Sequence, residues 1–497
     1  MPDIMKVANI LDAYQVDGVY ILEQDPPGQV KGRGTGVVGV VGEFERGPVN
    51  EIVSIGSPAE FTRIFGGYGA ASGNGYNGFN ILANKKFNQL RVVRVASSTQ
   101  AKATKSFNAA ETPVFKVTAK YVGLYGNDFS AQILAASDVS ITQGFRCKVF
   151  YKDELVLDAD NLNAADLEFP ENEYVDGAMV GTSVIKPDVA SATALAGGVD
   201  GTPADADYTG SGSDKDGIRL FEDVNDVNIL ICGKYNAAIN AALESHVALN
   251  EDKIAIIAGA YDDTVADAVA DVVSYRHDRI VYVYPYHKQW SFTKGDYIDV
   301  PASGVMASIL SVFGPEIDPA TIESVKYTTC IAGLTSGGTG FTWNDYVTLN
   351  KAGISALTFN PAYGYRFKNG VTTDLTSGKE PILRRRMTDF LQNSIADRLV
   401  FWQNKVNKRE NHVTIKGEIE AFLHDLGKKG IIPTKADVDA GTLPFLVDID
   451  SLNDNYTIAN GEFNILLKVR IFSSMRYIVL KAQIGTGVEV REEQSAG

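Results

Sequence analysis

Hydrophobic residues in the middle of the chain alternate between short apolar runs and longer stretches with helical spacing. This alternation is typical of strand and helix units on a largely parallel sheet. We therefore expect residues 31–98 and 206–375 to form a mixed-sheet core domain with flanking helices. The runs and stretches that carry this prediction are 218–222, 227–232, 235–249, 254–258, 264–275 and 279–284.

The segment 99–205 has a different pattern, with short β-rich pieces separated by turns. Such spacing predicts strands without intervening long helices. We interpret this segment as a β-rich insertion domain. The predicted strands are 114–121, 130–135, 144–151 and 154–157.

Two amphipathic helices are predicted in the last third of the chain. Residues 384–402 place an apolar face on one side of a helix, and residues 415–426 repeat the spacing. Two β runs follow. We assign 376–475 to a helical and β part of the inner core domain and 476–497 to a C-terminal arm. The apolar faces consist of Met387, Phe390, Leu391, Ile395, Leu399 and Trp402, and of Ile415, Ile419, Phe422, Leu423 and Leu426; the β runs are 463–472 and 477–484.

The N-terminal segment 1–30 is interpreted as a strand on a tether. Its β-forming residues are followed by prolines, which stop a helix and leave an extended backbone. Such a strand is free to pair with a sheet in the same chain or in a neighbouring one. The strand residues are Val19, Tyr20, Ile21 and Leu22, and the break is at Pro26, Pro27 and Gly28.

Two shorter helices carry explicit capping signals. Ser57 is placed to cap a helix that starts at Pro58 and stops at Gly66. Thr342 caps a helix over 342–349 in the same way. Together these elements predict a multidomain α/β (α+β) fold with extended N- and C-terminal strand arms.

Composition and charge narrow the classes of function. The 497 residues are 45% hydrophobic and 22% charged, as in globular proteins of several domains. The net charge of −15 argues against direct binding of nucleic acid or a membrane surface. The sequence contains no run of about 18 apolar residues, so no membrane-spanning helix is predicted. We expect no secretory signal, and we expect Cys147, Cys232 and Cys330 to be buried thiols of a protein made in a reducing cytoplasm.

Three glycines match a dinucleotide-binding fingerprint. Gly34, Gly36 and Gly39 have the Gly-x-Gly-x-x-Gly spacing. No strand is predicted before them, and residues 37–44 continue as apolar β sequence where the fingerprint requires a helix. We favour a glycine-containing strand.

The acidic residues of the segment 200–216 invite a calcium hypothesis. The glutamate expected at the end of a calcium loop is absent, and a solvated linker is favoured. The histidines form no zinc-type pair, and no nucleophile elbow or phosphate loop occurs. No catalytic, cofactor-binding or metal residue is predicted, although an α/β enzyme with a β-rich insertion stays an alternative. The residues concerned are Asp200, Asp205, Asp207, Asp214 and Asp216, and His246, His277, His287, His412 and His424.

Short motifs along nearly the whole chain resemble, in their order, those of contractile tail sheath proteins. The C-terminal part departs from the family at 369–373, where many relatives have Gly-Arg-Thr, and lacks a Phe-Glu-Pro segment. The motifs are Gly-Val-Tyr at 18–20, Glu-Arg-Gly-Pro at 45–48, Ser-Pro-x-Glu-Phe at 57–61, Phe-Gly-Gly at 65–67, Gly-Asn-Asp at 126–128, Gly-Gly-x-Asp-Gly at 197–201 and Pro-x-Ser-Gly at 301–304.

The resemblance implies a structural protein that forms stacked hexameric rings around a tail tube. In that family, subunits interlock by exchanging terminal strands, and contraction drives the tube through the host envelope for genome ejection. The implied partners are further copies of the chain, the tail tube protein, and baseplate and tail terminator proteins, in a virion assembled in the host cytoplasm. The sheath of a non-phage contractile injection system or bacteriocin is the alternative within the same class.

The resemblance also suggests the residues that act in assembly. The exchanged arms are expected to be disordered before assembly, with anchors at Val19, Ile21, Ile478 and Leu480. The basic run 384–386 is either a contact with the tube or a neighbour, or a set of ion pairs within the chain. The full predicted set is Val19, Tyr20, Ile21, Leu22, Tyr477, Ile478, Val479 and Leu480 for strand exchange, Pro26, Pro27, Gly28, Ser473 and Ser474 for hinges within the linkers 25–34 and 473–476, and Arg384, Arg385 and Arg386 for the contact.

Overall fold

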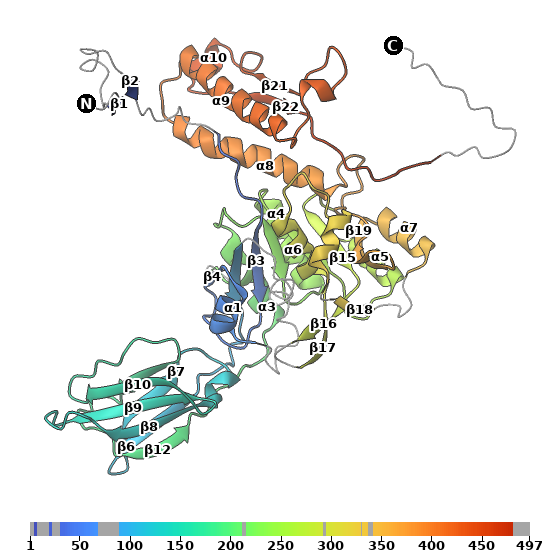
Figure 1. Ribbon diagram of the computed structural model, residues 1–497. Coiled ribbons are helices and arrows are strands. Elements are labelled where there is room, and N and C mark those ends of the chain that lie inside the picture. Colours follow the sequence, from blue (N-terminus) through green and yellow to red (C-terminus); the bar gives the residue numbers. More distant parts are fainter. Residues whose placement is uncertain are drawn as a thin grey trace.

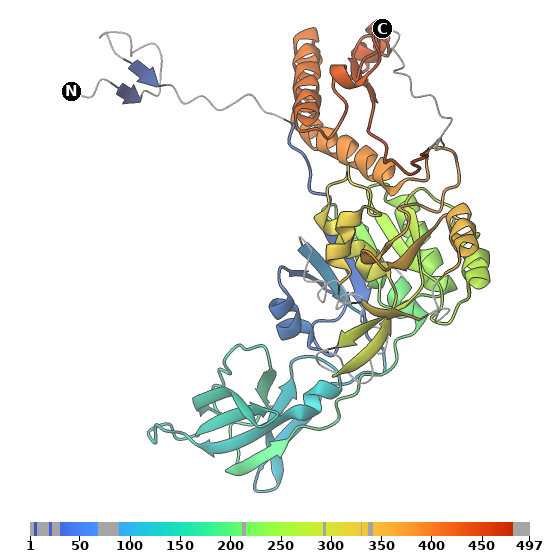
Figure 2. The same cartoon turned by 45° about the vertical axis from the view of Figure 1, so that its right-hand side comes forward.

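Buried hydrophobic side chains form three separate clusters in the part of the chain that the computed structural model describes. Each cluster is the centre of one unit, and the three units are stacked along the molecule (Figures 1 and 2). The core unit (37–95 and 205–367) lies between the insertion unit (101–199) and the C-terminal unit (382–469). The described residues are 4–6, 19–21, 30–67, 89–210, 215–291, 295–329, 331–335 and 341–480.

The core unit is built on an eight-stranded sheet of order β20-β19-β15-β14-β13-β3-β5-β4. Neighbouring strands from β19 to β5 pair in parallel, and β20 and β4 are antiparallel edge strands. The predicted mixed α/β core is therefore confirmed. The strands are β3 (Val37–Gly42), β4 (Ile52–Ile55), β5 (Gln89–Arg94), β13 (Ile229–Cys232), β14 (Ile254–Ala258), β15 (Ile280–Tyr284), β19 (Ile354–Asn360) and β20 (Gly364–Phe367).

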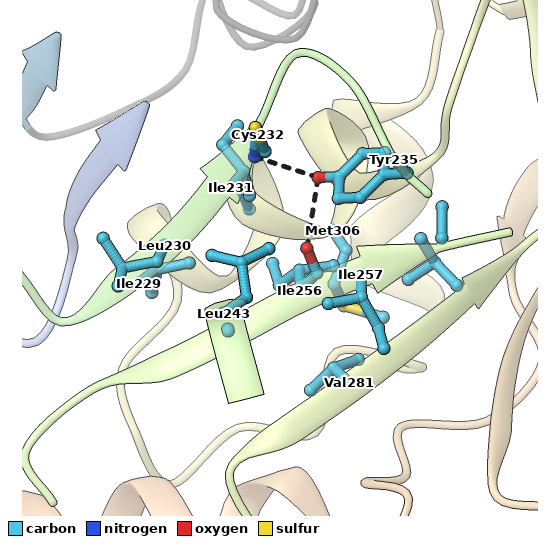
Figure 3. Close-up of a cluster of buried hydrophobic side chains, with 14 of the residues drawn as sticks. Ile229, Leu230, Ile231, Cys232, Tyr235, Leu243, Ile256, Ile257, Val281 and Met306 are labelled. Carbon is cyan, nitrogen blue, oxygen red and sulfur yellow. Dashed lines mark hydrogen bonds between the residues drawn. The ribbon is translucent and has the colours of Figure 1, made fainter. Parts of the chain in front are cut away.

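The central strands β13, β14 and β15 are buried along their whole length. Side chains of a strand alternate between two faces, so both faces of the sheet are covered there. Helices α4 (Ala237–Leu249) and α6 (Ser303–Val312) both contact β14. Figure 3 shows how Tyr235 joins two strands in this region: its hydroxyl accepts from the Cys232 N–H and donates to the Ile256 carbonyl, both at 3.1 Å.

Helix α1 (Pro58–Phe65) follows β4 and confirms the capping prediction. The Ser57 hydroxyl accepts from the Glu60 N–H at 3.2 Å, and the helix ends where Gly66 adopts a φ of 80°. A side chain other than glycine is strained at such a φ. The sequence signals therefore set both ends of this helix.

Helix α6 begins within the Pro-x-Ser-Gly motif at 301–304, where no helix was predicted. Its residues from Ser303 to Ser311 are all buried. A helix that is buried on every side has no amphipathic period, which is why the pattern did not reveal it. The predicted helix at Thr342 is confirmed as α7 (Trp343–Lys351). The core unit also contains α3 (Asp205–Thr209), α5 (Val265–Val272), the 3₁₀ helices η3 (Gly217–Phe221) and η4 (Ile322–Tyr327), and a three-stranded sheet of order β17-β16-β18. Its strands are β16 (His287–Ser291), β17 (Asp296–Val300) and β18 (Ile331–Leu334).

The insertion unit consists of two antiparallel sheets around its own hydrophobic cluster. One sheet has the order β10-β9-β8-β12 and the other β11-β7-β6. The predicted β-rich character is confirmed. The strands are β6 (Thr104–Ala109), β7 (Thr112–Ala119), β8 (Phe129–Ala135), β9 (Gly144–Tyr151), β10 (Glu154–Asn163), β11 (Val175–Met179) and β12 (Ala190–Ala194).

The C-terminal unit contains the two predicted amphipathic helices. These are α8 (Ile382–Leu399) and α9 (Arg409–Lys428), and their apolar faces meet in one cluster. A short helix, α10 (Asn455–Ala459), lies between the strands β21 (Phe445–Asp448) and β22 (Leu466–Val469). The pair β21 and β22 is antiparallel.

Candidate assembly site

The described end of the chain is an extended segment with a row of exposed apolar side chains. After β22 no helix or strand forms in residues 470–480. The sequence predicts that the run 477–484 becomes a strand when it pairs with a neighbouring copy. Among the described residues of the single chain, the segment 477–480 has no strand partner, and its exchange stays a prediction. Its exposed fractions are 78% for Tyr477, 83% for Ile478, 77% for Val479 and 89% for Leu480.

The strand pair β21 and β22 offers open edges in the same unit. Among the described residues neither strand has a second strand beside it. A cavity of about 420 Å³ lies between α9 and β21, lined in part by Leu423, Phe445 and Val447. An unpaired edge beside an apolar groove can accept an added strand, whose backbone completes the sheet while alternate side chains enter the groove.

The N-terminal prediction falls mostly outside the described residues. Val19, Tyr20 and Ile21 form β2 (Val19–Ile21), which pairs in parallel with β1 (Ile4–Lys6). Leu22 and the predicted hinge at Pro26, Pro27 and Gly28 are not described. The other predicted hinge residues, Ser473 and Ser474, lie in the segment after β22. Their role as hinges stays a prediction.

The arginines at the start of α8 form most of their contacts within the chain. The Arg385 guanidinium pairs with Asp278 at 3.2 Å and with Asp389 at 2.5 Å. Arg386 is 4% exposed and donates to the carbonyls of Leu310 and Phe313 at 2.6 and 3.0 Å.

The structure thus corrects the hypothesis of a tube or neighbour contact for two of the three arginines. Arg386 is buried, and burial lowers its pKa to about 10. Arg385 takes the intrachain ion pairs that the sequence left as the alternative. Arg384 is half-buried, and its predicted contact with the tube or a neighbouring copy stays a prediction.

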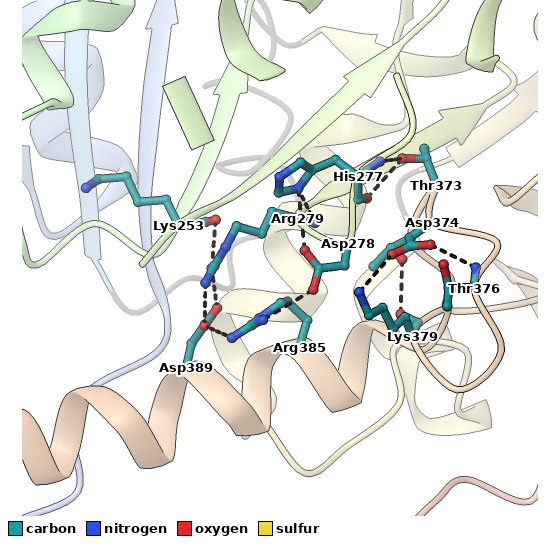
Figure 4. A network of polar contacts seen from close by, with 11 residues as sticks. Lys253, His277, Asp278, Arg279, Thr373, Asp374, Thr376, Lys379, Arg385 and Asp389 are labelled. Atoms are coloured by element: carbon teal, nitrogen blue, oxygen red, sulfur yellow. Dashed lines mark hydrogen bonds and ion pairs between the residues drawn. The ribbon is translucent and has the colours of Figure 1, made fainter. Parts of the chain in front are cut away.

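A polar network joins the core unit to the C-terminal unit (Figure 4). The Arg279 guanidinium, next to β15, forms a two-pronged pair with the Asp389 carboxylate of α8 at 2.7 and 3.0 Å. The same guanidinium donates to the Lys253 carbonyl at 3.4 Å. Burial raises the pKa of Asp389, and the two neighbouring guanidinium groups act in the opposite direction. This network fixes α8 on the sheet of the core unit.

A second joint holds the insertion unit on the core unit. Arg94, at the end of β5, is 2% exposed and donates to the carbonyls of Phe44, Gly47 and Val122 at 3.0, 2.9 and 3.0 Å. Burial lowers its pKa to about 10. Arg94 could not be identified from the sequence, because an arginine inside an apolar strand gives no local sign of its partners.

The glycine fingerprint does not form a nucleotide loop. Gly39 lies inside β3, and a Cβ there would be 2.7 Å from the Leu230 side chain. This close packing explains why a glycine occupies this position without requiring a bound nucleotide. It agrees with the glycine-containing strand that the sequence favoured.

Among the described residues, the acidic side chains of the segment 200–216 and the histidines do not gather into one site. Asp205 pairs with Lys234 at 2.7 Å, and Asp200 accepts from the Leu124 N–H at 2.7 Å. The described part of the chain holds no group of three or more acidic, histidine or cysteine residues suited to a metal ion. Asp200 is thus held by the insertion unit and Asp205 by the core unit, whereas the sequence favoured a solvated segment; residues 211–214 are not described.

The two described cysteines are buried. Burial raises the pKa of both Cys147 and Cys232 to about 12. Both are buried, as predicted, and Cys330 lies outside the described residues. In the described ranges, no helix is both long and apolar enough to cross a membrane.

Comparison with known proteins identifies the fold. No family model and no curated protein sequence matches the chain. Among solved structures, the sheath tail protein of Desulfitobacterium hafniense covers 91% of this chain and 100% of its own, with a TM-score of 0.62 and 14% identity. The sheath tail protein of Listeria innocua covers 88% and 96%, with a TM-score of 0.61 and 16% identity.

Sheaths of injection systems have the same architecture. The contracted sheath of an extracellular contractile injection system covers 95% of this chain and 99% of its own, with a TM-score of 0.56 and 12% identity. The chain therefore has the fold of contractile sheath proteins over nearly its whole length. At this level of identity the likeness concerns the fold.

Proposed function

We propose that this protein is a structural subunit of a contractile sheath and that its copies polymerise into a helical tube. The observation that carries the proposal is the match of all three stacked units to sheath tail proteins, over 91% of this chain. A fold alone does not define a function. The exposed C-terminal segment and the open strand pair supply the site that the proposal needs.

Strand exchange is the proposed means of assembly. The segment 477–480 of one copy, and the N-terminal strand of another, would add to the open edges of β21 and β22. Ordering each residue costs about 1–2 kcal/mol. Burying a large apolar side chain gains roughly 1.5–3 kcal/mol, and each backbone hydrogen bond about 0.5–1.5 kcal/mol. The apolar side chains and backbone groups of an added strand can therefore offset its ordering.

The proposed partners follow from the sheath role. The copies would form stacked hexameric rings around a tail tube protein and meet baseplate and tail terminator proteins at the two ends. Contraction would keep each subunit folded while its packing changes, and would drive the tube through the host envelope for genome ejection from a virion. A non-phage injection system or bacteriocin is the second candidate, since the solved sheath of an extracellular contractile injection system shares the fold.

An enzymatic role is the less favoured alternative. The parallel sheet of the core unit could support one, but the glycine fingerprint is packed against Leu230 and the described residues hold no metal-type cluster. A ligand that raised the melting temperature of a monomer would favour it.

Negative-stain electron microscopy of the purified full-length protein tests the sheath proposal. Hollow helical tubes are expected, formed either alone or on a tube template. A variant lacking residues 1–24 should stay folded and monomeric. If that variant formed normal tubes, the N-terminal strand would not be needed for assembly. If the intact protein formed no tubes, either alone or on a tube template, the sheath proposal itself would be contradicted.

A further inference from the structure

The chain is fixed to the C-terminal unit immediately before it enters β3. Val30 is 7% exposed and belongs to the hydrophobic cluster of α8 and α9. Gly32 lies against the Phe390 ring, where a Cβ would be 3.1 Å from the ring edge. The part of the predicted flexible linker 25–34 from Val30 onward is therefore packed.

Arg33 connects the segment before β3 to both the C-terminal unit and the core unit. Its backbone N–H donates to the Ser394 hydroxyl at 2.9 Å, and its guanidinium lies 3.5 Å from the Asp397 carboxylate, both on α8. The same guanidinium donates to the carbonyl of Asn225, in the loop before β13 of the core unit. One side chain thus spans the joint between the two units.

The next residues continue this attachment. The Thr35 carbonyl accepts from Arg386 at 3.4 Å, and the Gly36 carbonyl accepts from the Ser311 hydroxyl at 2.5 Å. Between Val30 and β3, the residues Val30, Gly32, Arg33, Thr35 and Gly36 therefore contact α6, α8 or a core loop, while Lys31 and Gly34 are exposed.

We propose that Arg33 is a positioning residue that holds the root of the N-terminal arm at Val30 and thereby limits which neighbouring copy the arm can reach. This inference rests on the proposed exchange of the N-terminal strand. If Arg33 and the neighbouring contacts of this segment were all released, the root of the arm would move to the start of β3 at Val37.

Chain geometry gives the size of the effect. A fully extended chain spans at most about 3.3–3.6 Å per residue. From Leu22 to Val30 the tether covers at most ~29 Å, and from Leu22 to Val37 at most ~54 Å. The attachment of the segment from Val30 to Gly36, here called the clamp, thus shortens the reach of the N-terminal arm by nearly half. An acceptor strand edge must therefore lie within ~29 Å of Val30. A shorter tether also raises the effective concentration of the strand at a site within its reach.

The first test measures the clamp in the unassembled protein. Trypsin can cut after the exposed Lys31, between the buried Val30 and the held Arg33. Cleavage after Lys31, scored by mass spectrometry, should be at least about tenfold faster in Arg33→Ala than in the intact chain, because a site is cut when its segment opens locally. Asp397→Asn, which removes one partner, should give a smaller increase.

Arg409→Ala is the matched control, because that arginine forms an ion pair with Asp450 on the surface of the C-terminal unit, with 63% of its side chain exposed. It should leave cleavage after Lys31 unchanged. Equal rates in Arg33→Ala and the control would overturn the clamp.

The second test measures the polymer by electron microscopy and light scattering. Arg33→Ala should raise the critical concentration for assembly several-fold, or give tubes of mixed width and helical repeat. Faster cleavage with unchanged polymers would overturn the limit on reach. If the intact protein forms no polymer, the proposed function fails, while the cleavage rates still decide whether the clamp exists.

Discussion

Arg279 and Asp389 form a buried ion pair across the joint between the core unit and the C-terminal unit, with nitrogen to oxygen distances of 2.7 and 3.0 Å. Their side chains are 5% and 11% exposed. Removing one partner of a buried pair leaves an uncompensated charge. We therefore expect Asp389→Ala to lower the free energy of unfolding by about 3–5 kcal/mol, measured by urea denaturation.

The control is the exposed pair of Arg409 and Asp450, with side chains 63% and 64% exposed. Exposed pairs contribute about 0–1 kcal/mol, so Asp450→Ala should change stability little. A loss in Asp389→Ala no larger than in this control would show that the joint does not depend on the pair.

The sequence was most informative where local chemistry decides the structure. The Ser57 cap, the Thr342 cap and the apolar faces of α8 and α9 are local patterns, and the structure confirms them. The predicted parallel arrangement follows from the alternation of strands and helices and is also confirmed.

Features that depend on distant partners could not be predicted. Helix α6 is buried on all sides and has no period to detect. Arg386 was predicted as part of a basic contact or of ion pairs, and nothing in the sequence singled out Arg94, yet each donates to carbonyl groups far away in the sequence. The candidate arms were suggested by proline breaks and apolar runs, whereas the open edges of β21 and β22 emerge only once the strands are placed.

Gly39 offers a direct test of the strand interpretation of the glycine motif. A Cβ at this position would lie 2.7 Å from Leu230 and 3.0 Å from Val227. Overpacking of a core costs about 1–3 kcal/mol, so Gly39→Ala should lower the melting temperature. Gly34→Ala is the matched control, since no atom lies within 4 Å of its Cβ position. Equal stability of the two variants would contradict the close packing of β3.

His246 is expected to make the protein sensitive to acid. It is 4% exposed, faces Lys253, Glu222 and Asp252, and has a pKa lowered to about 4, chiefly by burial. The unfolded chain takes up the proton at a higher pH, so stability is present above about pH 6.5 and is lost as the pH falls toward 4.

The measurement is urea unfolding at several pH values between about 7 and 4. His246→Gln should reduce the loss of stability over this range by a few kcal/mol. The exposed His424 controls for the loss of a histidine side chain, and His424→Gln should change the free energy of unfolding at neutral pH little. An unchanged pH dependence in His246→Gln would mean that other groups account for it.

The exposed apolar segment at the C-terminal end gives the sharpest test of assembly. Ile478 and Leu480 are 83% and 89% exposed, so Ile478→Asp with Leu480→Asp should leave the melting temperature of the monomer unchanged. In a polymer the same positions would be buried in a neighbour, where each aspartate loses about 1.5–3 kcal/mol of apolar burial and adds the cost of burying a charge. Tubes should therefore disappear in electron microscopy and sedimentation velocity. Val139→Asp, at a position 94% exposed on the insertion unit, is the matched control and should still polymerise. If the double variant formed tubes as readily as that control, the segment 477–480 would not be an exchanged strand, and assembly would have to depend on the N-terminal arm.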